Sequence, residues 1–153
     1  MQSEKEIIWT AGLLEGEGSF RNKTHGHVPI VECEMTDKDV IEKLQEIWGG
    51  KIYFYPARKS HYKDTWTWHI SGEDAAQIMN TILPFMFERR SSKMQTVLFN
   101  WQKRKDTISS NEQNGLKAAE EYLLSSLSLR QVAKKYSISY ETVRRNLKKV
   151  NNN

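Results

Sequence analysis

The order of apolar and polar positions predicts a mixed pattern of helices and short strands. A short apolar helix containing IWTAGLL is expected near the N-terminus. Val28 to Met35 alternates apolar residues with Glu32 and Glu34, which indicates a strand. Thr36 is expected to cap the following helix, DKDVIEKLQEIW, and Gly49-Gly50 to end it.

The clearest period-two alternation lies in KIYFYPAR and TWTWHI, which we predict to form a β-hairpin. One face carries Ile52 and Phe54 with the two tryptophans of the second strand, and is expected to pack on helices. The other face is polar. The connecting loop, RKSHYKD, is basic.

Two further helices are expected, EDAAQIMNTIL between Gly72 and Pro84 and a longer one from about Phe85 to Lys105. The segment DTISSNEQNG has the composition of a linker. We therefore predict a domain over 1–106, a linker over 107–114 and a small helical module over 115–150. The first domain is expected to be α+β, with helices on one face of an antiparallel sheet and the other face open.

Charge is distributed unevenly along the chain. From Asn114 to the end there are eight Lys and Arg against three Asp and Glu, whereas the rest holds 15 against 16. A basic module on a nearly neutral domain favours an anionic partner, and nucleic acid is the commonest. No membrane-length apolar run is present, so we expect a soluble intracellular protein. The single Cys33 excludes an internal disulfide and is expected in the core.

Two glutamates lie between glycines where the first helix should end, in EGEG. Gly12 and Gly16 are one turn apart and would let another backbone approach closely. Glu15 and Glu17 oppose the helix macrodipole there, at about 0.3–1 kcal/mol each. A bound divalent cation is one way to offset this cost.

The stretch TAGLLEGEG, Thr10 to Gly18, followed by Ser19-Phe20, resembles the motif of the LAGLIDADG homing endonucleases. The order of expected elements from about Ile7 to Lys105 is similar to the αββαββα core of that family, with its saddle-shaped antiparallel sheet. The resemblance implies a site-specific endonuclease in which motif helices pack together. It assigns metal binding, as Mg²⁺ or another divalent cation, to Glu17 with the Gly16 carbonyl, and the helix interface to Ala11, Gly12, Glu15 and Gly16.

The sequence departs from the family pattern in both acids, which are Glu, and in Thr10 at the leading position. Glutamate keeps the charge and the oxygen ligands that magnesium needs. The family also places a basic residue near the metal-bound water, and Arg89, Arg90 and Lys93 all lie close to that position. Lys93 is preferred because lysine changes its pKa more readily than arginine. Asp37 matches a polar position of the active-site solvent.

Because the motif occurs once, the resemblance implies a homodimer and a near-palindromic double-stranded DNA target. Two alternatives on the same fold are a non-catalytic DNA-binding regulator and a splicing cofactor that binds intron RNA. His25 and His27 lack a nearby Cys or acidic partner, so we expect a loop near DNA instead of a metal site. The sheet residues expected to contact DNA are Arg21, Lys23, Lys51, Tyr53, Tyr55, Arg58, Lys59, Lys63, Thr65, Thr67 and His69.

The C-terminal stretch LSLRQVAKKYSISYETVRRNLKK resembles the helix-turn-helix of resolvases and transposases. Ser139 would cap a second helix whose N-terminal part meets base edges in the major groove. The alternative is a solvated basic hairpin that serves only to support a dimer. The residues expected to contact DNA here are Tyr140, Glu141, Thr142, Arg144 and Arg145, with Lys134, Lys135, Lys148 and Lys149 on phosphates.

Overall fold

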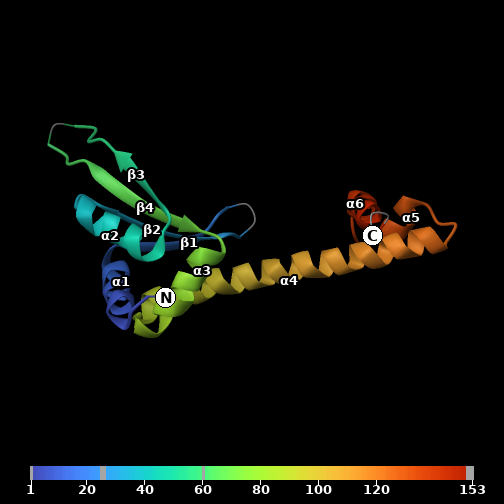
Figure 1. The fold of residues 1–153 in the computed structure, drawn as a ribbon, viewed down its shortest axis with the longest axis horizontal. Coiled ribbons are helices and arrows are strands. Elements are labelled where there is room, and N and C mark those ends of the chain that lie inside the picture. Colours follow the sequence, from blue (N-terminus) through green and yellow to red (C-terminus); the bar gives the residue numbers. More distant parts are fainter. Residues whose placement is uncertain (1, 25–26, 60, 151–153) are drawn as a thin grey trace. The chain divides into compact units, whose positions relative to one another are not determined.

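The computed structural model describes residues 2–24, 27–59 and 61–150. The chain divides into two compact units, Met1–Gln102 and Lys103–Asn153, and helix α4 runs from the first into the second. Figure 1 labels the helices and strands, which are α1 (Glu4–Glu17), β1 (Gly18–Asn22), β2 (Pro29–Met35), α2 (Lys38–Trp48), β3 (Lys51–Tyr55), β4 (Thr65–Ser71), α3 (Glu73–Ile82), α4 (Glu88–Leu124), α5 (Leu129–Lys135) and α6 (Tyr140–Val150). A short 3-10 helix, η1 (Leu83–Phe85), follows α3.

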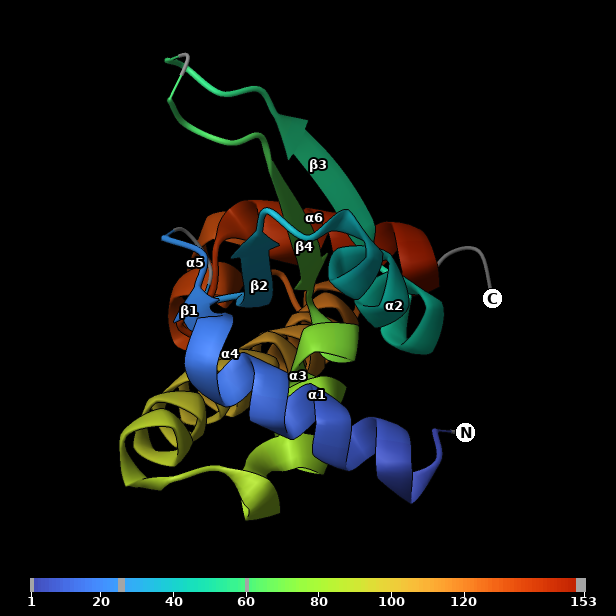
Figure 2. The same ribbon diagram turned by 90° about the vertical axis from the view of Figure 1, so that its left-hand side faces the viewer.

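The first unit is built on a four-stranded antiparallel sheet in the order β1-β2-β4-β3. Helices α1, α2 and α3 pack on one face of this sheet, as Figure 2 shows. Leu14, Val31 and Trp68 are fully buried between the two layers together with Met79 and Met94. The predicted α+β fold, with helices on one face and an open second face, is confirmed.

Local sequence explains most element boundaries, with two corrections. Ser3 and Glu6 form a capping box that starts α1 at Glu4, four residues before the expected apolar stretch. The residue at the N-cap of α2 is Asp37 and not Thr36, and its side chain makes no capping hydrogen bond. Phe54 lies on the apolar face of the hairpin but is 53% exposed, because the strands extend beyond the helices there; it contacts Trp66 at 5.4 Å between ring centroids.

Residues 107–114, for which a linker is predicted, are helical and lie inside α4. Ser and Asn are weak helix formers but do not break a helix as Pro does. Packing on the C-terminal side of this segment favours the helix, and Glu112 pairs with Lys149 of α6 at 2.6 Å. The two units meet at Gln102 and Lys103, a few residues before the predicted boundary.

The second unit has a small core of Ala118, Val132, Ala133 and Val143, contributed by α4, α5 and α6. A Cβ at Gly115 of α4 would collide with the side-chain amide of Asn146 on α6, so glycine lets the two helices approach without displacing that side chain. Ser128 with Gln131 caps α5, and Ser139 caps α6 by accepting from the Thr142 amide at 3.2 Å. The predicted helices are present. That they form a DNA-binding helix-turn-helix stays a prediction.

Candidate functional site: the end of the motif helix and the open sheet face

The motif glutamates lie where α1 ends and β1 begins. Glu17 is the last residue of α1 and is exposed. Gly18 then donates its amide to the Leu14 carbonyl, and a Cβ at Gly18 would collide with the Leu14 backbone. The glycine therefore allows an abrupt change from helix to strand, and this change holds Glu17 at the edge of the sheet.

Arg90 of α4 closes the end of α1. Its guanidinium donates to the carbonyls of Glu15 (Nε, 3.0 Å), Gly18 (Nη1, 2.6 Å) and Gly16 (Nη2, 3.0 Å). These carbonyls belong to the end of a helix, where the macrodipole is negative and intrahelical donors are missing. A guanidinium of the same chain therefore provides positive charge at this helix end, where a bound cation was one predicted source of it.

Glu15 has a structural partner in the same place. Its Oε2 accepts a hydrogen bond from the backbone amide of Phe87, immediately before α4, at 3.1 Å. An amide at a helix start lacks an intrahelical acceptor, and a carboxylate there also favours the positive end of the dipole. Two sets of hydrogen bonds thus join the end of α1 to the start of α4. Arg90 of α4 donates to carbonyls at the end of α1, and the Glu15 side chain of α1 accepts from the amide that precedes α4. Glu17 is left without a partner of this kind among the described residues.

The other predicted active-site residues fall in different surroundings. Arg89 and Lys93 are exposed and lie one turn apart on α4, and neither makes an ion pair within the described ranges. Arg90 is occupied by the helix end, which leaves these two as the free basic candidates. Asp37 is exposed at the start of α2. His25 lies outside the described residues, and the His27 carbonyl accepts from the Asn22 side chain at 3.0 Å.

The oxygen ligands at this helix end are of the type that magnesium binds, but one chain alone supplies few of them. Glu17 offers exposed carboxylate oxygens, and magnesium is typically held by one or two carboxylates, waters and substrate phosphates. The Gly16 carbonyl already accepts from Arg90, although it keeps a second lone pair. Within residues 2–24, 27–59 and 61–150, no three His, Cys, Asp or Glu side chains gather into a metal site. One copy of the described residues therefore offers at this helix end only Glu17 and the Gly16 carbonyl for a magnesium ion.

The open sheet face forms a hollow of about 1130 Å³ that begins at Glu17 and reaches the β3–β4 loop. Several predicted DNA-contacting residues line it, and acidic residues that the prediction missed line it too. Thr67 is 9% exposed, and its hydroxyl has no hydrogen-bond partner among the described residues. The lining residues are Glu17, Ser19, Glu32, Glu34, Thr36, Tyr55, Pro56, Ala57, Arg58, His61, Tyr62, Lys63, Thr65 and Thr67.

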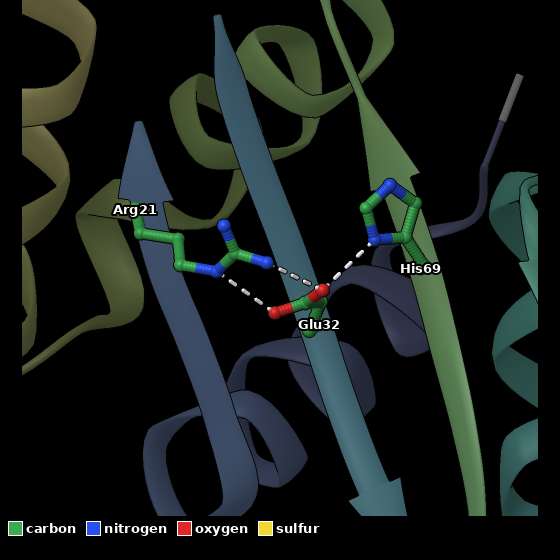
Figure 3. A network of polar contacts seen from close by, with 3 residues as sticks. All are labelled: Arg21, Glu32 and His69. Atoms are coloured by element: carbon green, nitrogen blue, oxygen red, sulfur yellow. Dashed lines mark hydrogen bonds and ion pairs between the residues drawn. The ribbon is translucent and has the colours of Figure 1, made fainter. Parts of the chain in front are cut away.

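Glu32, at the middle of this face, is the most informative missed residue. Arg21 Nε and Nη2 donate to its two carboxylate oxygens at 3.0 and 2.8 Å, and His69 Nδ1 lies 2.9 Å from Oε1 (Figure 3). Partial burial tends to raise the pKa of Glu32, but the hydrogen bonds and charges of Arg21 and His69 outweigh it and lower the pKa. The alternation in β2 already placed Glu32 opposite the core side, and this was the available signal.

The remaining predicted residues of the first unit are exposed on the loops and edge strand. Lys51, Tyr53 and Tyr55 lie on the edge strand β3, with Tyr53 edge-on to His69 at 6.1 Å. Lys59 lies over the Tyr62 ring at 5.8 Å. Lys23 is exposed, and its backbone amide donates to Val28 at 2.7 Å. These residues form a basic and aromatic rim beside the hollow.

In the second unit the predicted DNA-contacting side chains differ in exposure and in their partners. Tyr140, Arg144, Arg145 and Lys148 are exposed on α6. Thr142 is half-buried, and its hydroxyl lies 2.9 Å from that of Ser139, so it belongs to the helix cap. Two of the predicted lysines are partly neutralised, since Lys135 pairs with Glu121 and Lys149 with Glu112, whereas Lys134 is exposed.

The fold and the helix-end geometry together define a class: this is the fold of the LAGLIDADG homing endonucleases. The homing endonuclease I-CvuI in complex with its target, solved with calcium, matches with a TM-score of 0.51 at 16% identity, over 88% of this chain and 96% of that one. I-CvuI with the I-CreI target and magnesium, in which the DNA is not cleaved, gives 0.49 at 16% identity, over 89% and 97%. The archaeal intron-encoded endonuclease I-Vdi141I complexed with DNA gives 0.49 at 15% identity, over 89% and 97%.

Comparison by sequence adds no relative, since no family of known proteins and no curated protein matches this chain. The structural likeness therefore establishes the fold alone, and an activity has to be inferred from the residues of the site. A search for membrane-spanning helices within the described part of the chain finds none of sufficient length and apolar character.

Proposed function

We propose that the protein is a site-specific DNA endonuclease that acts as a homodimer and depends on a divalent cation such as Mg²⁺. One observation carries the proposal: an exposed glutamate, Glu17, ends a helix whose outward face is uncovered by the described residues of its own chain. The same glutamate borders the hollow of the open sheet face. A nuclease built in this way has metal-binding and DNA-binding surfaces that meet at one edge.

The outward face of α1 supports the homodimer. Ile8, Gly12 and Gly16 follow one another at one-turn spacing, and all three are exposed. A Cβ at Gly12 or Gly16 would meet no atom of the described residues within 4 Å, so no contact within that part of the chain requires glycine there. Close approach of a second α1 does require it. Ala11, predicted for the interface, is 2% exposed and belongs to the core of its own chain.

The open sheet face is suited to the major groove. An antiparallel sheet with polar and basic side chains on its free face can contact base edges, which carry a distinct pattern in that groove. The rim lysines and arginines of the β3–β4 loop supply charge for phosphates, a contribution that does not depend on sequence. Two copies related by a two-fold axis would read two half-sites of one near-palindromic target.

In the proposed reaction each residue has a limited task. Glu17 supplies a carboxylate ligand, and Arg90 fixes the helix end so that this carboxylate keeps its position. A magnesium ion, when bound, supplies Lewis-acid polarisation of the phosphate and lowers the pKa of water. Arg89 or Lys93 would provide the positive charge near the attacking water, with Lys93 preferred because lysine exchanges a proton more readily. Asp37 would order solvent.

We also propose that the second unit binds DNA as a helix-turn-helix. Its support is a capped helix, α6, whose exposed residues Tyr140, Arg144, Arg145 and Lys148 are available for contact. Replacing Arg144 and Arg145 by Ala should weaken binding and flatten its salt dependence while leaving the cut position unchanged. A shifted cut position would show that this unit sets the register. Unchanged binding would favour the dimer-support alternative.

The central test compares Glu17→Gln with Glu34→Gln on a randomised duplex library, with magnesium or with calcium. Both variants remove one carboxylate that borders the same hollow. We expect E17Q to retain binding and lose cleavage by about 10³-fold or more, whereas E34Q continues to cleave. Loss of binding in E17Q with cleavage per complex unchanged would contradict the assignment. Bound duplex without any cut ends in the parent protein would point to the regulator.

A further inference from the structure

Glu32 presents a physical problem for a surface that faces DNA. Its side chain lies at the centre of the open face, on β2, between the strands that carry Arg21 and His69. A carboxylate there repels phosphates and the acceptor atoms of bases. Such a charge lowers affinity unless it performs a task that offsets the repulsion.

The geometry assigns that task to the orientation of Arg21. Glu32 accepts hydrogen bonds from one edge of the guanidinium, donated by Nε at 3.0 Å and by Nη2 at 2.8 Å. Figure 3 shows Nη1 pointing away from the carboxylate. Nη1 and the second hydrogen of Nη2 therefore form a free edge with two parallel donors. Arg21 is 46% exposed, so this edge is accessible to a ligand.

His69 holds the carboxylate from a third strand. Because an ionised carboxylate can only accept, the 2.9 Å contact requires the proton on Nδ1 of His69. Glu32 is thus fixed from β1 and from β4, and its side chain is only 24% exposed. A carboxylate held on both sides gives Arg21 one preferred orientation, which reduces the entropy that Arg21 would otherwise lose on binding.

We propose that Glu32 positions Arg21 to recognise a guanine in the major groove of each half-site. Two parallel donors match the O6 and N7 acceptors of guanine, the commonest specific contact of arginine. A phosphate is the weaker alternative, because the adjacent carboxylate offsets the charge of Arg21. The inference rests on the proposed function and adds a positioning residue and one base of the target.

The test is selection of bound duplexes from a randomised library, in calcium, by the full chain and by three variants. Arg21→Lys keeps the charge but loses the planar fork, and Glu32→Gln keeps the shape but loses the charge. Arg58→Lys is the matched control, since Arg58 is also exposed beside the hollow and has no ion pair within the described ranges. Circular dichroism melts confirm that each variant is folded.

We expect the parent protein to select a guanine at one position in each half-site, by about tenfold over other bases. R21K and E32Q should lose that preference and keep the preferences at other positions, whereas R58K should keep it. E32Q should bind non-specific duplex at least as tightly as the parent, because a negative charge has been removed. A change at a merely structural residue is not expected to lower selectivity while affinity is retained.

A chemical substitution in the DNA checks the contact directly. Replacing the selected guanine by 7-deazaguanine removes N7 and should weaken binding of the parent, but not of R21K. If R21K and the parent select the same bases, or if E32Q keeps the guanine preference, the inference is wrong while the endonuclease proposal stands. If the parent selects no sequence at all, both are wrong.

Discussion

The three hydrogen bonds from the Arg90 guanidinium form a clamp at the end of the motif helix, and its removal has an effect on stability that we can predict quantitatively. Replacing Arg90 by Ala removes three hydrogen bonds to carbonyls at the junction of α1 and β1, two of them partly buried. A hydrogen bond to a charged group contributes about 1.5–3 kcal/mol when well shielded. Discounting the exposed third bond and the access of water to the freed carbonyls, we expect a loss of about 2–4 kcal/mol in the free energy of unfolding.

Arg89 provides the matched control, because it is the adjacent residue with the same charge and is exposed. Arg89→Ala should change stability by less than about 0.5 kcal/mol. Arg90→Lys should lose roughly half as much as R90A, since an ammonium cannot reach three carbonyls in a fork.

The assay is urea unfolding followed by tryptophan fluorescence at fixed protein concentration. All five tryptophans lie in the first unit, so this signal reports the unit that contains the clamp. Equal midpoints and slopes for R90A and R89A would refute the clamp as a stabilising element. A difference confined to the slope would indicate a change in the unfolded state instead.

Three further predictions concern single positions. Gly12→Leu should leave the fold intact by circular dichroism but weaken self-association at least about tenfold in sedimentation velocity, and a variant that stays dimeric would remove α1 from the interface. Burial, with a smaller effect of Glu17, raises the pKa of Cys33 to about 11, so iodoacetamide at pH 8 should react about 100-fold more slowly than with urea-unfolded protein; equal rates would contradict this. Gly115→Ala should destabilise the second unit by about 1–3 kcal/mol, despite better helix propensity, because the new methyl meets Asn146; slower amide exchange in α6 would refute it.

The periodic features of this fold were predictable because their causes are local. The alternation in TWTWHI fixes which residues of β4 face the core, and Trp68 is buried as expected. The glycines and glutamates of the motif likewise marked the end of α1. Sequence also placed Glu32 on the polar side of its strand.

The contacts that define the site were not predictable, because their partners lie far apart in the chain. Arg90 bonds Glu15 across 75 residues, and no local pattern distinguishes it from Arg89. The meeting of Arg21, Glu32 and His69 depends on strand order β1-β2-β4, which alternation alone does not give. The helical state of 107–114 was missed because contacts outside the segment outweigh its weak helix formers.

The clamp between α1 and α4 also has a consequence for biosynthesis. Arg90, which holds the end of the motif helix, is made on the ribosome more than 70 residues after that end. A growing chain folds as a unit only when its closing contacts can form. The end of α1, with Glu17, therefore becomes ordered together with the completion of the first unit, and an unfinished chain lacks the contacts that hold this helix end.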